Sequence, residues 1–448
     1  MSDCVIRFGG SYCSNTPFIK GFSEYIKNFE GRSFIVVSAI PDIKSLISDS
    51  IANVLQSGDF EEEFEKQLQA FFTKETGGKA TVPYLSTTEE LVKLLKGIRL
   101  IGDYSEALKA EVLSFGEKLS AQILFYRLTK WVDVQLIQPE EIGLKVTPDY
   151  GNATYTGVEM EKVNRLNPNG VFLLPGSYGV TPQGKIARAG YAASDYTAAA
   201  LAALVKAPKL ILWGMEKEFF SADPQIVENP LRIKRLTYAE ASELAYFDHY
   251  SLHPRIVEPL EAKHIPIHIV SAASNNIETL INTETYVAKQ IVKSVAYSDD
   301  ISILSLNGPG VGLKPGILAK VTNCLNDADI NIKSVITAQV AINLILSKEN
   351  GRRALELIRN LGFDSVQNIQ FRDNVSLIGI IGHGLQQNFG ILAKLLNAVA
   401  QNKVNVILSG SGSANLVSYI VVKDTDRDVC IHGIHRAFFN KATGKSNI

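Results

Sequence analysis

The last third of the chain repeats one pattern, and this repeat limits the folds that are open to it. The segment GILAKVTNCLNDADINI at 316–332 matches GILAKLLNAVAQNKVNV at 390–406. The surrounding residues, 300–347 and 374–422, each show the order strand, loop, helix, strand, strand. A repeat of about 75 residues is too long for a solenoid unit, so it predicts a small α+β domain that is present twice.

Upstream of residue 295 the pattern changes, and short apolar runs alternate with helical segments. The expected strands lie within 4–12, 33–40, 171–179, 209–213 and 265–270, and the expected helices within 43–128, 195–206 and 238–247. Continuous apolar strands are typical of a parallel sheet that is buried on both faces. We therefore predict an α/β domain over 1–290, followed by small domains over 299–372 and 373–448. A strand from 288–298 is a candidate to complete the last of these.

The composition excludes several classes of function. The 45 Lys and Arg residues nearly balance the 46 Asp and Glu residues, which argues against nucleic acid or a membrane surface as the main partner. No apolar run has the length of a membrane span and no segment resembles a signal peptide, so we expect a cytoplasmic protein. The four cysteines, Cys4, Cys13, Cys324 and Cys430, have no paired spacing, and we expect neither a metal site nor disulfides.

Residues 185–204, KIARAGYAASDYTAAALAAL, begin as a Gly/Ala loop and continue as an Ala-rich helix. Ser194 and Asp195 stand where the N-cap of this helix is expected. A helix N-terminus collects unpaired N–H groups and the positive end of the helix dipole, which suits a phosphate or a carboxylate. The segment therefore predicts an anion-binding loop, with a plain helix cap as the simpler alternative.

The sequence resembles the aspartokinases, amino-acid kinases that carry two C-terminal ACT domains. The resemblance rests on the order and spacing of motifs along nearly the whole chain: RFGG at 7–10, VVSA at 36–39, FGEKLS at 115–120, PGSYGVTPQG at 175–184, SDYTAA at 194–199, YAEASELAYF at 238–247 and LHPRIVEPL at 252–260. It implies an amino-acid kinase fold and phosphoryl transfer from ATP, with Mg²⁺, to the side-chain carboxylate of aspartate. It also implies effector binding by the ACT domains, and we expect these to pair in a homodimer or a larger assembly.

The resemblance implies roles for individual residues. The catalytic positions are Arg7 and Asp195, and the substrate-binding positions are Ser38, Glu117, Arg188 and Ser194. The positions for phosphate or nucleotide are Gly9, Gly10, Ser11, Gly179 and Asp223, and those for an effector are Gly316 and Gly390, each at the start of a helix. In the family, the glutamate that corresponds to Glu117 binds the α-amine of the substrate.

Several family positions carry other residues here. Arg7 stands at the phosphate-binding lysine, and the motif TTLGRGGSD corresponds to ARAGYAASD at 187–195, so that Tyr191 replaces the arginine that clamps the substrate carboxylate. Arg188 is a candidate to replace this clamp. Gly214 and Met215 replace a nucleotide-binding Thr-Asp pair, and Tyr250 replaces a lysine. We therefore expect weak binding of MgATP.

Two functions stay open on these grounds: an active kinase, for aspartate or for a different acid, and a non-catalytic paralogue that senses an effector or assembles subunits. The ACT repeats carry TAQVAI and SANLVS in place of the effector-site motif SSE, so feedback by lysine is not implied.

Some single residues also have a structural interpretation. Glu117 could be a charge on a helix surface, His253 is expected to be structural, and Trp213 is expected to lie in the core. The acidic stretch at 59–72 is expected to form a solvated helix face.

Overall fold

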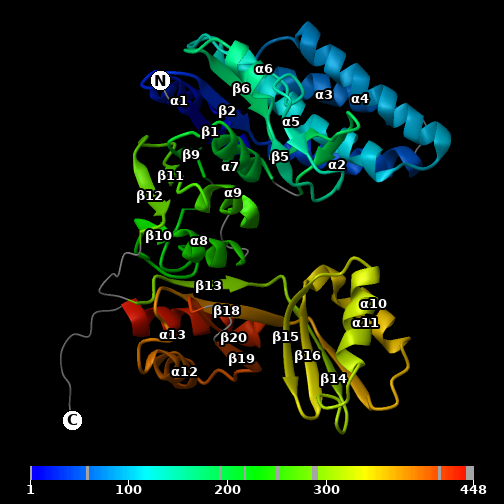
Figure 1. Ribbon diagram of the computed structural model, residues 1–448, viewed down its shortest axis with the longest axis vertical. Coiled ribbons are helices and arrows are strands. Elements are labelled where there is room, and N and C mark those ends of the chain that lie inside the picture. Colours follow the sequence, from blue (N-terminus) through cyan, green and yellow to red (C-terminus); the bar gives the residue numbers. More distant parts are fainter. Residues whose placement is uncertain are drawn as a thin grey trace. The chain divides into compact units, whose positions relative to one another are not determined.

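The structure is a computed structural model that describes residues 3–56, 60–190, 193–215, 218–247, 252–284, 291–411 and 415–439. The chain forms two compact units (Figure 1). The first comprises 1–218, 234–242 and 251–285, and the second comprises 219–233, 243–250 and 286–448. Two short segments of the predicted α/β region therefore pack with the C-terminal repeats.

An eight-stranded sheet organises the first unit, with the strand order β10-β12-β11-β9-β1-β2-β6-β3. All of its neighbouring strands are parallel except the β11–β12 pair. This confirms the predicted α/β class. The strands are β1 (Cys4–Phe8), β2 (Ser33–Val37), β3 (Gln135–Leu136), β6 (Val171–Pro175), β9 (Leu210–Trp213), β10 (Arg235–Thr237), β11 (Ile267–Val270) and β12 (Ile277–Asn282).

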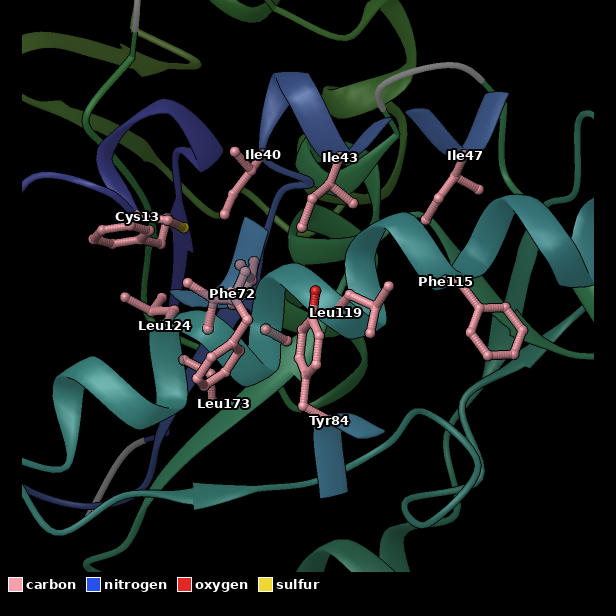
Figure 2. Close-up of a cluster of buried hydrophobic side chains, with 14 of the residues drawn as sticks. Cys13, Ile40, Ile43, Ile47, Phe72, Tyr84, Phe115, Leu119, Leu124 and Leu173 are labelled. Carbon is pink, nitrogen blue, oxygen red and sulfur yellow. The ribbon is translucent and has the colours of Figure 1, made fainter. Parts of the chain in front are cut away.

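The helices of the first unit include the group predicted over 43–128. They are α1 (Thr16–Ile26), α2 (Pro41–Gln56), α3 (Phe60–Thr76), α4 (Val82–Ile101), α5 (Glu106–Leu128), α6 (Met160–Arg165), α7 (Ser194–Leu204), α8 (Tyr238–Ala245) and α9 (Glu258–Glu261), although Glu243–Ala245 of α8 belong to the second unit. Phe115 and Leu119 of α5 belong to one hydrophobic cluster with Ile43 of α2 and Tyr84 of α4, and Figure 2 shows Leu119 next to Tyr84. Because α5 packs between these helices and the sheet, several of its polar side chains are buried, among them Glu117, Ser120 and Gln122.

The acidic stretch at 59–72 begins with Asp59, which lies outside the described residues, and from residue 60 on it matches its prediction at most positions. Glu62 and Glu63 of α3 are exposed, as a solvated face requires. Glu61 differs, because it is buried and its Oε1 lies 2.9 Å from Arg99 Nε of α4. A buried carboxylate needs such a counter-ion, since burial without a partner would be costly.

A second, smaller sheet carries the start of the segment that was predicted to be a loop. It has the order β5-β4-β7-β8 and comprises β4 (Lys145–Val146), β5 (Tyr155–Gly157), β7 (Tyr178–Val180) and β8 (Ile186–Arg188). The interpretation of 186–188 as loop was wrong, because these residues pair antiparallel with β7, and Arg188 lies opposite Tyr178. A three-residue strand has too few side chains to show a period in the sequence.

Two four-stranded antiparallel sheets form most of the second unit and confirm the duplicated α+β fold. One has the order β15-β16-β14-β17 with α10 and α11, and the other has β13-β18-β20-β19 with α12 and α13 (Figure 1). The strands are β13 (Ser294–Ser298), β14 (Ser302–Asn307), β15 (Ile332–Ala338), β16 (Ala341–Leu346), β17 (Asn368–Arg372), β18 (Val375–Ile381), β19 (Leu408–Ser411) and β20 (Val417–Lys423). The helices are α10 (Ile317–Asp327), α11 (Lys348–Arg359), α12 (Ile391–Gln401) and α13 (Arg427–Phe439). No helix in the described ranges combines the length and apolarity that a bilayer span needs.

A buried histidine ties the segment 219–233 to α13 within the second unit. His435 Nε2 lies 2.8 Å from Ser221 Oγ, which also accepts a hydrogen bond from the N–H of Leu231 at 2.8 Å. We assign the serine hydroxyl hydrogen to the bond with His435, which requires a neutral imidazole. Burial, and next the nearby His432, lower the pKa of His435 below its ordinary value.

This arrangement predicts an acid-sensitive second unit. The folded-state pKa of His435 is lower than the unfolded value of about 6.5, so the unfolded chain binds the proton first. The contribution of His435 to the free energy of unfolding is therefore fully present above the unfolded pKa of about 6.5. It declines as the pH falls through this value toward the lower folded-state pKa. We expect urea unfolding at pH 7.5 and 5.5 to show a larger loss for the wild type than for His435→Gln. His383→Gln, at an exposed position, should keep the wild-type dependence, and equal pH dependence in all three proteins would contradict the assignment.

Candidate functional site

The candidate site lies at the carboxyl edge of the main sheet, where β1, β2 and β6 end. Gly9 and Gly10 follow β1, Ser38 follows β2, and Gly176 follows β6. A Cβ atom at Gly10 would overlap the carbonyl oxygen of Ala39, so a glycine is needed there for the two loops to touch. Ligands of open α/β sheets bind outside this edge of the strands.

The N-terminus of α7 points to the same edge, and its geometry differs from the prediction in one respect. The N-cap is Ala193, with no side-chain cap hydrogen bond, while Ser194 and Asp195 stand in the first turn. The interpretation of Ser194 and Asp195 as a plain helix cap is therefore wrong. Their side chains make long-range contacts instead, and Ser194 Oγ lies 2.6 Å from Ser38 Oγ.

Arg7 and Asp195 form a buried ion pair at the centre of the site. Arg7 Nε donates to Asp195 Oδ1, and Arg7 NH1 donates to the carbonyl oxygen of Gly214 at 3.4 Å. The other carboxylate oxygen of Asp195 accepts the backbone N–H of His253 at 3.3 Å. The pair joins the central strand β1 to the first turn of α7. The structure thus brings the two predicted catalytic residues together.

Glu117 and Arg188 form a second pair. Glu117 lies on α5 and is almost completely buried, so the interpretation as a helix-surface charge is wrong. Its Oε1 accepts a hydrogen bond from Arg188 NH2 of β8 at 3.4 Å. The two residues are 71 positions apart in the chain, and the pairing of β8 with β7 sets where Arg188 lies.

Residues around the start of α7 complete the site, and sequence reasoning did not single them out. Tyr155 Oη lies 2.6 Å from Thr197 Oγ1, and burial raises the pKa of Tyr155 well above its ordinary value. Arg255 donates to Tyr196 Oη at 2.9 Å, and its guanidinium stacks 4.4 Å from that ring. The motif LHPRIVEPL contains Arg255, but nothing in its spacing shows that the arginine reaches Tyr196.

His253 lies next to these residues and has the structural role that was expected. Its Nδ1 accepts the N–H of Arg255 at 3.2 Å, and its ring stacks on Tyr196 at 5.8 Å between centroids. Burial is the main cause that lowers its pKa, with the charge of Arg255 adding to it against the opposing charge of Asp195. The imidazole is therefore a neutral hydrogen-bond acceptor. Trp213, also as expected, is fully buried and stacks on Phe8 at 5.1 Å.

The remaining predicted residues lie in several places. Ser11 is exposed in the turn after Gly10, and Gly179 lies in β7 opposite Ala187. Asp223 belongs to the second unit, where it accepts a hydrogen bond from Tyr297 Oη at 3.1 Å.

The two predicted effector positions each lie at the start of a helix. Gly316 and Gly390 are left-handed N-caps of α10 and α12, with φ of 91° and 80°. Tyr191, Ala192 and Tyr250 lie outside the described residues.

The fold and this site define a class of protein. A mostly parallel sheet has a buried arginine and a helix N-terminus at its carboxyl edge, and two small α+β repeats follow it. The model of the amino acid kinase family matches residues 4–271, and a model of the ACT domain matches residues 378–438. The chain belongs to the amino acid kinase family.

Among its relatives the chain is similar to aspartokinases along almost its whole length. It is 26% identical to aspartokinase 2 of Arabidopsis thaliana, covering 97% of this chain and 84% of that protein. It is also 26% identical to bifunctional aspartokinase/homoserine dehydrogenase 2 of the same plant, covering 98% of this chain but only 51% of the relative. The chain thus spans about half the length of the bifunctional relative.

Solved structures share the fold. E. coli aspartokinase III in complex with aspartate and ADP superimposes with a TM-score of 0.80 at 21% identity, over 98% of this chain and 100% of that one. Aspartate kinase of Clostridium acetobutylicum gives a TM-score of 0.76 at 21% identity, over 97% of this chain and 100% of that one.

Two glycines at the site allow a matched test of its packing. An alanine Cβ at Gly176 would lie 2.7 Å from Ser194 Cβ, whereas one at Gly116 of α5 would lie 3.7 Å from Ala39 Cβ, an ordinary contact. We expect Gly176→Ala to lower the free energy of unfolding by about 1–3 kcal/mol because Ser194 must move. Gly116→Ala should be neutral or stabilising by about 0.5–1 kcal/mol because it replaces a glycine inside a helix. Chemical unfolding measures both, and equal effects would show that Gly176 does not hold α7 in place.

Proposed function

We propose that this chain is an ATP-dependent phosphotransferase that phosphorylates a carboxylate of a small acid, either aspartate, which the names of its relatives suggest, or a different acid. The observation that carries the proposal is the position of Arg7. It lies buried at the end of β1, beside Gly9 and Gly10, and its partner Asp195 holds it to the first turn of α7. A fixed cation, a glycine turn and a helix N-terminus at one place suit the transferring phosphate.

The residues present fit the phosphates of ATP. The turn at Gly9 and Gly10 offers backbone without side chains, and a Cβ at Gly9 would overlap the carbonyl oxygen of Gly214. Mg²⁺ bound with ATP would supply further neutralisation of the phosphate charge. Since the transition state spreads negative charge over the phosphoryl oxygens, positioning and fixed positive charge supply most of the catalysis.

The chain's own residues would act in three ways. The Arg7 guanidinium would bind phosphate oxygens, Asp195 would orient it through Nε, and Ser194 with Ser38 would offer hydroxyl donors between phosphate and acceptor. Glu117 and Arg188 would bind the acid. No proton needs to be removed, because a carboxylate is already the nucleophile, which agrees with the neutral, hydrogen-bonded His253.

A second function is favoured by the same ion pair. Arg7 is bound to Asp195, so its charge is partly neutralised before any phosphate enters. A protein that keeps the fold for sensing or assembly would tolerate this, and the activity test below separates the two. In either case we propose assembly as a homodimer or a larger complex through the ACT sheets, whose edge strands include β15 and β19.

The activity test uses hydroxylamine to trap the acyl phosphate that forms from ATP and an acid. We expect acid-dependent turnover by the wild type, and a loss of about 10²–10³-fold in kcat for Arg7→Ala, because one fixed donor to the transferring group is removed. Arg32→Ala is the matched control, since Arg32 pairs with Asp3 before β2, at the amino edge of the sheet. It should retain kcat. Absence of turnover with aspartate and with related acids would favour the non-catalytic function.

Nucleotide affinity is a separate prediction. Because Gly214 and Met215 offer no side-chain carboxylate or hydroxyl, we expect MgATP to bind with a dissociation constant of roughly 0.1–1 mM, at the weak end of ordinary substrate affinities. Calorimetry measures it, with Arg32→Ala again as the control. A dissociation constant of a few micromolar would show that other residues hold the nucleotide.

A further inference from the structure

Glu117 and Arg188 form the part of the proposed site where the acid would bind, and Arg188 compensates the negative charge of Glu117 there. The side chains are 3% and 12% exposed, so water screens them little. Arg188 is held in place by its backbone, since its N–H donates to Tyr150 and its carbonyl oxygen accepts the N–H of Ala153. The guanidinium is therefore a built-in counter-ion on a fixed strand.

The pair lies beside Ser38 and Ser194, where the transferring phosphate is proposed to bind. Gly116, next to Glu117, packs near Ala39, and the neighbouring Ser38 contacts Ser194 in the first turn of α7. Tyr155 contacts Thr197 one turn further along α7, and the charges of both Glu117 and Arg188 act on its pKa. An acid that presents one carboxylate to the adjoining hydroxyls of Ser38 and Ser194 would thus have its other end near Arg188.

The Glu117–Arg188 pair determines which charge suits the end of the acid that lies near Arg188. A ligand ammonium at Glu117 would lie beside the Arg188 guanidinium, a like charge that is itself largely buried. Displacing that guanidinium would leave it buried without its partner. A guanidinium has five N–H donors, of which one binds Glu117, and Arg188 Nε is buried without a hydrogen-bond partner among the described residues. The ligand group that suits this arrangement is an anionic oxygen.

We propose that the acceptor is a small dicarboxylic acid without an α-ammonium group, and that Arg188 is the residue that selects it. The proposal rests on the proposed phosphotransfer, whose acceptor it names. Arg188 neutralises Glu117 and donates to the second carboxylate of the acid. The same contact excludes an amino acid, because the ammonium would meet a guanidinium in place of a free carboxylate.

Calorimetric titration of the full chain with succinate and with aspartate tests this, each in the presence of MgADP. We expect the wild type to bind succinate at least tenfold more tightly than aspartate, and Arg188→Thr to reverse the order. Lys185→Thr removes the same charge from an exposed position just before β8 and should keep the wild-type order. Because the readout is binding, a failure of phosphoryl transfer would leave this result standing.

Arg188→Thr leaves Glu117 buried without a counter-ion and could fail to fold, so the double variant Arg188→Thr/Glu117→Gln provides the second test. It removes both charges, and the ratio of the two affinities should fall to about one. Three results would overturn the proposal: aspartate binding as tightly as succinate to the wild type, no binding of either acid, or an unchanged ratio in the double variant. The last of these would mean that the pair only stabilises the fold.

Discussion

The contact on which the site depends is the buried ion pair between Arg7 and Asp195. It joins the central strand of the main sheet to the first turn of a helix that begins 187 residues later. Removing one member of such a pair leaves an unpaired buried charge, which typically costs about 3–5 kcal/mol. The pair therefore holds the N-terminus of α7 against the carboxyl edge of the sheet, and the contact between Ser38 and Ser194 follows from this placement.

Two buried pairs, Arg7 with Asp195 and Glu117 with Arg188, form the two ends of the proposed site, one for the phosphate and one for the acid. Each pair is neutral as a whole, and the attraction within it offsets part of the cost of burying two charged side chains. In each pair the arginine has further N–H donors that could bind an anion. Under the proposed function, Arg7 and Arg188 supply positive charge at positions where the resemblance places a lysine and a threonine.

The second unit shows how packing can cross a boundary that the sequence suggests. Residues 219–233 lie within the sequence range of the kinase family, yet Ala222 and Val227 belong to the same hydrophobic cluster as Ile378 of β18 and Ile431 of α13. Strand β13 likewise precedes the first repeat in sequence but pairs with β18 of the second. The first case rests on burial of apolar side chains, and the second on an antiparallel edge that β13, within the range 288–298 predicted to complete the last domain, reaches and completes.

The sequence by itself determined the α/β class, the duplicated α+β repeat, the main strands and the family, because apolar periodicity and motif order are properties of the chain alone. It also predicted Arg7, Asp195 and Glu117 as site residues, and this stays a prediction. Only the tertiary structure decided what these side chains contact: Ser194 and Asp195 bind Ser38 and Arg7 and do not cap their helix, and Glu117 is buried against Arg188. The physical reason is that such contacts join residues 71 to 188 positions apart, whose meeting is set by strand pairing and burial and leaves no local pattern.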